Sequence, residues 1–128
     1  MIQFPFLSLQ QYLNILRIAL GLMMAAHGVI RIYAGTVGGF GNFLGSKGIP
    51  LGVIVAWGIT VFEISGGLTL TTGLYKKLIC FIFIVELTVG IFFVHIPRGW
   101  FVVGYTVGGM EYSVLLILCF FTVASVKK

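Results

Sequence analysis

Charged side chains are scarce in this sequence, and aspartate is absent. Only 9% of the 128 residues are charged. Soluble domains typically carry about 25% charged residues, which help to cover their surface with groups that water solvates. The composition therefore excludes an ordinary soluble globular domain. A hydrophobic content of 59% also excludes a disordered chain, because disorder requires low hydrophobicity.

Cysteine is also rare. Cys80 and Cys119 are too few for a disulfide-stapled miniprotein or a four-thiolate metal site. They form no Cys-x-x-Cys pair, which favours two small buried apolar residues over a thiol–disulfide centre. The two histidines, His27 and His95, do not pair at helical spacing, so we expect neither a metal ion nor a haem.

The net charge of +5 is spread along the chain. The basic residues stand singly or in pairs at the ends of apolar runs and form no patch that would follow a phosphate backbone. We therefore expect membrane lipid, and no nucleic acid, as a partner.

Long apolar runs are what the sequence has in abundance. A helix that crosses a bilayer core of about 30 Å needs about 20 apolar residues. We predict one domain over residues 1–128, an all-α membrane protein that forms an antiparallel four-transmembrane-helix bundle. The predicted spans are residues 13–33, 51–74, 78–95 and 107–126.

The basic residues near the span ends predict the topology, because cytoplasmic loops carry an excess of Lys and Arg. Five basic residues fall on the side of both termini and three on the other, so we expect both termini in the cytoplasm and a bacterial cytoplasmic (inner) membrane location. The first group is Arg17, Lys76, Lys77, Lys127 and Lys128, and the second is Arg31, Lys47 and Arg98.

Two outer connections differ in character. Residues 34–50 are rich in glycine, which predicts a flexible loop whose Phe40, Phe43 and Leu44 dip into the bilayer edge. Residues 96–106 carry aromatic side chains and predict a segment of the aromatic belt at the membrane surface.

All three acidic residues, Glu63, Glu86 and Glu111, fall inside apolar segments. Ionisable groups within spans are costly and point to function by default. The alternative is that they pair with Arg17, Arg31 or a histidine and only hold helices together. The residues alone leave both interpretations open.

Helical geometry and depth in the membrane predict which of the ionisable side chains lie together. At 100° and about 1.5 Å per residue, four outer-half groups can converge on one polar pocket, with Glu63 at its floor. They are His27, Arg31, His95 and Glu111.

Glu86 is separated from His95 by nine residues, or 180° in an α-helix, so we expect it at a second seam or at a contact between copies in a homo-oligomer. Small residues let membrane helices approach closely. The predicted helix-packing glycines are Gly21, Gly28, Gly66 and Gly67.

Taken together, these motifs resemble the DoxX family of small four-helix bacterial membrane proteins. The match of order and spacing extends over nearly the whole chain, although Glu86 is outside the family pattern. The family often continues past the fourth span with a short tail, and this sequence stops at Lys127-Lys128. The motifs are Arg17–Gly21, His27-Gly28 with Arg31, Phe43-Leu44, Gly48–Pro50, Glu63–Leu74 with its Gly66-Gly67 pair, His95 and Gly109–Glu111.

The resemblance implies a redox or quinone-linked role, because family members include a subunit of an archaeal thiosulfate:quinone oxidoreductase. We therefore expect an accessory subunit of a membrane redox or envelope-stress system, with a quinone or similar ligand in the polar pocket and a redox protein as partner. Two alternatives remain: a small proton- or ion-coupled transporter or channel, and a structural assembly factor without a ligand. Whether the protein is an enzyme stays open.

Overall fold

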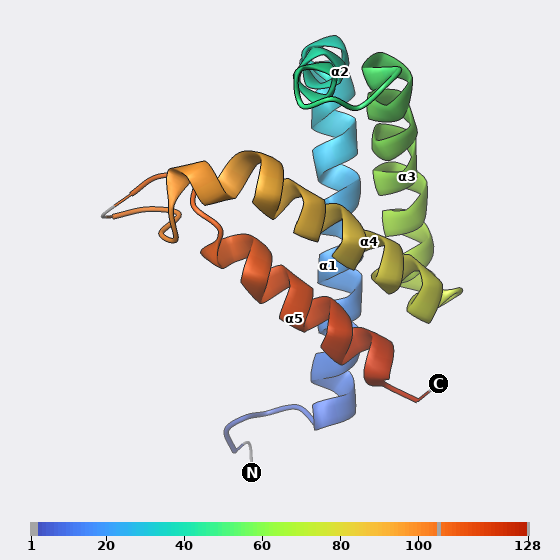
Figure 1. Ribbon diagram of the computed structural model, residues 1–128. Helices are drawn as coiled ribbons and strands as arrows, with labels where there is room; N and C mark the ends of the chain where they lie inside the picture. The colour runs from blue at the N-terminus through green and yellow to red at the C-terminus, as the bar shows by residue number, and fades with distance from the viewer. Residues whose placement is uncertain (1–2, 105, 128) are drawn as a thin grey trace. The chain divides into compact units, whose positions relative to one another are not determined.

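A computed structural model describes residues 3–104 and 106–127 of the chain. The secondary-structure elements of these residues are all helices, with no strand among them (Figure 1). Lys128, one of the basic residues counted for the topology, lies outside them. The chain divides into two compact units. Because of this division, the single domain over residues 1–128 stays a prediction. We call Ala19–Leu74 the central unit, and Met1–Ile18 with Tyr75–Lys128 the terminal unit.

Helix α1 spans Leu9–Tyr33 and contributes to both units. It begins four residues before the predicted span, because Ser8 and Gln11 cap its first turn. The Ser8 hydroxyl accepts a hydrogen bond from the Gln11 amide at 3.2 Å, and the Gln11 side chain accepts one from the Ser8 amide at 2.8 Å. This reciprocal arrangement is a capping box.

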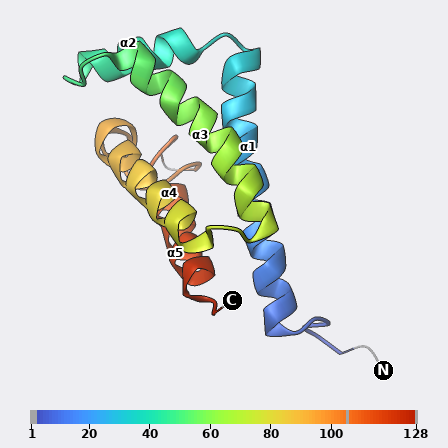
Figure 2. The same ribbon diagram turned by 90° about the vertical axis from the view of Figure 1, so that its right-hand side faces the viewer.

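In the central unit, α3 (Gly52–Thr72) runs antiparallel to the second part of α1, and α2 (Val37–Ser46) lies across their ends (Figures 1 and 2). Helix α3 ends at Gly73, whose left-handed backbone (φ 85°) lets its amide reach the Leu70 carbonyl at 3.0 Å. Glycine adopts this conformation without steric cost.

Helix α2 corrects the prediction of a flexible loop over residues 34–50. Its buried residues, Val37, Gly41 and Leu44, recur at helical spacing on one face. A Cβ atom at Gly41 would lie 2.5 Å from Val53 Cα, so glycine lets α2 pack directly on the start of α3. Packing of this kind outweighs the low helix propensity of glycine.

In the terminal unit, α4 (Lys76–Gly90) and α5 (Glu111–Ser125) lie side by side in both views and run antiparallel (Figures 1 and 2). The buried rings of Phe83 and Phe120 pack against each other, with their centroids 5.3 Å apart. Where α4 begins and α5 ends, Lys76 Nζ donates a hydrogen bond to the Val126 carbonyl.

Helix α4 continues into a π-helical turn, Ile91–His95, and a 3₁₀ turn, Ile96–Arg98. Counting 100° per residue assumed a regular α-helix up to His95. A π-helix bonds i to i+5 and therefore turns less per residue. The predicted 180° between Glu86 and His95 thus does not hold across this segment.

Three helical segments of the described residues are long and apolar enough to cross a membrane: Leu9–Tyr33, Gly52–Thr72 and Lys76–Arg98. Helix α5 is apolar but shorter than the predicted span 107–126. Its 15 residues reach about 22 Å, against about 30 Å for the bilayer core. The structure therefore supports an all-helical membrane protein, and the fourth span remains a prediction.

Candidate functional site

The site in the central unit depends on a close approach of α1 and α3. A Cβ atom at Gly21 would lie 2.4 Å from the Gly67 carbonyl oxygen, and one at Gly67 would lie 2.4 Å from that of Gly21. Further along, a Cβ atom at Gly28 would lie 2.7 Å from the Thr60 carbonyl oxygen. Side chains larger than hydrogen would push the helices apart at these positions. Gly66 differs from these three glycines in what surrounds it. The atoms nearest to a Cβ atom at Gly66 would belong to Phe62 of its own helix, α3.

The close contact brings Arg31 of α1 to Glu63 of α3. Arg31 Nη1 donates a hydrogen bond to Glu63 Oε1 at 2.6 Å and another to Thr60 Oγ1 at 3.0 Å. The Glu63 side chain is only 3% exposed, whereas that of Arg31 is 18% exposed. The Thr60 hydroxyl in turn donates to the Ala56 carbonyl at 2.7 Å. The carboxylate is therefore paired, while the guanidinium keeps one edge accessible.

An aromatic ring from α2 completes this group. The Arg31 guanidinium carbon lies 4.6 Å from the centroid of the Phe40 ring, a cation–π distance. We call Arg31, Phe40, Thr60 and Glu63 the arginine cluster. Sequence reasoning missed Thr60, although its spacing of three residues from Glu63 places both on one helix face. It assigned Phe40 to a flexible loop and so missed its role beside Arg31.

His27 lies on α1 but not in the arginine cluster. Its side chain is exposed, and Nδ1 is 3.1 Å from the Met23 carbonyl oxygen of its own helix. The histidine thus bonds within its own helix.

His95 and Glu111 lie together in the terminal unit, where both contact the segment that joins η2 to α5. His95 Nδ1 is 2.8 Å from the Gly108 carbonyl oxygen. Glu111 Oε1 accepts a hydrogen bond from the Val102 amide at 3.0 Å. Each side chain is partly buried and bonds to the backbone of the connection. The joint pocket of all five predicted residues stays a prediction, because Arg31 and Glu63 belong to the other unit.

Glu86 lies on α4 and is half-buried. Its placement at a second seam or between copies stays a prediction. Among residues 3–104 and 106–127, no three His, Cys, Asp or Glu side chains gather as a metal ion would require.

A protein-family model described as DoxX matches residues 12–96. The matched range includes His27, Arg31, Glu63 and His95 but ends before Glu111. Comparisons with curated proteins and with solved structures found no match. Because the family model covers more than half of the 128 residues, the chain belongs to the DoxX family.

Proposed function

We propose that this DoxX-family membrane protein is an accessory subunit of a membrane redox or envelope-stress system, and that its arginine cluster binds a quinone or a similar lipid-soluble ligand. The observation that carries the proposal is the accessible edge of Arg31. Nη1 makes both hydrogen bonds of the guanidinium to the described residues. The N–H groups on Nε and Nη2 make none to these residues.

Where lipid or a bound ligand keeps water away from these N–H groups, they need another acceptor. A ligand with carbonyl oxygens and an apolar ring satisfies them. A quinone carbonyl would accept from Nε or Nη2, and the adjacent Phe40 would give its ring an apolar contact. The negative charge of Glu63 would hold the guanidinium in place while the ligand binds.

In this proposal the chain holds the ligand, and a redox protein partner exchanges electrons with it. The proposed topology is four spans with both termini in the cytoplasm of a bacterium, which places Arg31 near the outer membrane surface. The same cluster in a purely structural assembly factor would link α1, α2 and α3 and bind nothing.

Mass spectrometry of small molecules extracted from the protein in native-lipid nanodiscs separates these functions. We expect a stoichiometric quinone with the unaltered protein and its loss in Arg31→Gln, which removes the charge and the free edge. Lys47→Gln, at the end of α2 and outside the cluster, is the matched control and should retain the quinone. Equal quinone in Arg31→Gln and Lys47→Gln would contradict the proposal.

A further inference from the structure

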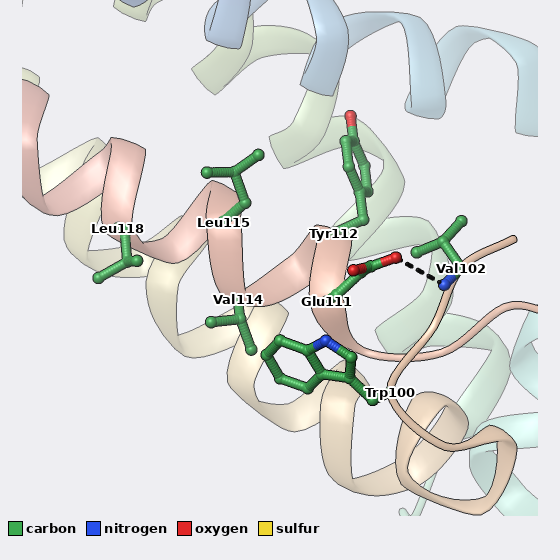
Figure 3. A pocket seen from close by; sticks show the side chains of 7 residues that line it. All are labelled: Trp100, Val102, Glu111, Tyr112, Val114, Leu115 and Leu118. Carbon is green, nitrogen blue, oxygen red and sulfur yellow. Dashed lines mark hydrogen bonds between the residues drawn. The ribbon is translucent and has the colours of Figure 1, made fainter. Parts of the chain in front are cut away.

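A second site lies in the terminal unit, where α5 begins. A pocket of about 560 Å³ opens there, a volume within the range of small-molecule sites. Trp100 and Val102 of the connection line one side, and the first turns of α5 line the other (Figure 3). The α5 residues are Glu111, Tyr112, Val114, Leu115 and Leu118.

Glu111 is the charged residue of this lining. Its Oε1 accepts the Val102 amide, and the dashed line in Figure 3 marks this bond. Within the part of the chain that the structure describes, its other oxygen accepts no hydrogen bond, and its carboxylate forms no salt bridge. The pocket therefore presents a carboxyl group that has no basic partner among the described residues.

The surroundings of this carboxylate define what can bind. The rest of the lining is aromatic and aliphatic, with Trp100 and Tyr112 on either side of Glu111 (Figure 3). Aromatic faces attract cations, and a carboxylate in an apolar setting attracts them more strongly than one in water. Leu115 and Leu118 are 57% and 59% exposed, which gives the pocket an apolar rim.

We propose that the Glu111 pocket binds a lipophilic organic cation, a molecule whose positive charge is surrounded by apolar groups. A metal ion fits poorly, because one carboxylate supplies too few ligands. A zwitterionic lipid headgroup fits poorly as well, since none of the described residues that line the pocket is a lysine or arginine that could receive its phosphate. The lining residues belong to the terminal unit and lie beyond the residues that match the DoxX family model.

The proposal is tested by titrating tetraphenylphosphonium into the full-length protein in phosphatidylcholine nanodiscs. With Trp57→Phe as the background, Trp100 is the sole tryptophan and reports occupancy through its emission. Tetraphenylborate is the matched probe, because it has the same apolar shape and the opposite charge. We expect saturable binding of the cation and none of the anion.

Two matched variants complete the test. Glu111→Gln keeps an acceptor for the Val102 amide and removes the charge, so we expect at least about tenfold weaker cation binding with an unchanged helical content. Glu86→Gln makes the same change on α4 and should leave the affinity unaltered. Replacing half of the phosphatidylcholine by phosphatidylethanolamine should also leave it unaltered.

Equal affinity in Glu111→Gln, an equal loss in Glu86→Gln, or equal binding of tetraphenylborate would overturn the proposal. Competition by phosphatidylethanolamine would also overturn it, by assigning the pocket to a lipid headgroup. Quinone retention is read separately, so a failure at Glu111 leaves the proposed function of the arginine cluster untouched.

Discussion

Arg31 Nη1 donates to Glu63 Oε1 at 2.6 Å and to Thr60 Oγ1 at 3.0 Å, which links the end of α1 to the middle of α3 through one nitrogen. This relationship explains how a carboxylate that is only 3% exposed persists in an apolar segment. Its negative charge is balanced at hydrogen-bond distance, while the far edge of the guanidinium stays accessible. The bond between Arg31 and Glu63 thus holds α1 against α3 and also positions the guanidinium for the proposed ligand.

Removal of Glu63 should destabilise the protein because Arg31 loses its counter-charge. We expect Glu63→Leu to cost about 3 kcal/mol of unfolding free energy and Glu63→Gln, which keeps an acceptor, about 1 kcal/mol. The double variant Arg31→Met/Glu63→Leu should be more stable than Glu63→Leu alone, since no charge is left unbalanced. Unfolding titrations in detergent micelles measure these differences. Strictly additive effects would show that the two side chains do not interact.

The contact between Gly21 and Gly67 should tolerate no side chain. A Cβ atom at either position would lie 2.4 Å from the opposing carbonyl oxygen, so we expect Gly21→Ala and Gly67→Ala to lower the midpoint of thermal unfolding by several degrees. Gly58→Ala is the matched control, because nothing lies within 4 Å of its Cβ position on α3. It should be neutral or stabilising by up to about 1 kcal/mol. Equal effects at the three positions would argue against this close approach.

Helix α2 offers a test of its own. Gly39→Ala meets nothing within 4 Å and should strengthen the helix, whereas Gly41→Ala would place a Cβ atom 2.5 Å from Val53 Cα and detach it from α3. Hydrogen–deuterium exchange over Val37–Ser46 should therefore slow in the first variant and accelerate in the second. Fast exchange of this segment in the unaltered protein would instead support the flexible loop.

The four-span topology predicts which loops face the cytoplasm. In a background where Ser replaces Cys80 and Cys119, a cysteine at Lys47 should react with a membrane-impermeant maleimide in intact cells. A cysteine at Lys77 should react only after the cells are opened. Labelling of both from outside, or of neither, would contradict the predicted crossing of the second span, which separates Lys47 from Lys77.

The sequence predicted the membrane class and three long membrane helices. Apolar runs of this length can be recognised without knowing which helices contact one another. The partner of Glu63 could not be chosen from the sequence, for a physical reason. A helical wheel orients a side chain around one axis, but the neighbour of that face depends on contacts such as that between Gly21 and Gly67.

Two local features could not be predicted from the pattern of apolar and glycine residues. The glycines of residues 34–50 predicted a loop, although Gly41 is the residue that lets α2 pack as a helix. The fourth predicted span began at residue 107, yet α5 begins at Glu111. Gly104 and Gly108 have φ values of 93° and 76°, which helical backbone does not adopt, so the connection continues to the start of α5.

The most direct test of the arginine cluster is the infrared carbonyl stretch of a short-chain quinone labelled with carbon-13 at its carbonyls, bound in nanodiscs. If Arg31 donates from its free edge, one carbonyl band should shift to lower frequency than in protein-free lipid. The shift should vanish in Arg31→Gln and persist in Lys47→Gln. A band at the lipid frequency in the unaltered protein would contradict quinone binding at Arg31.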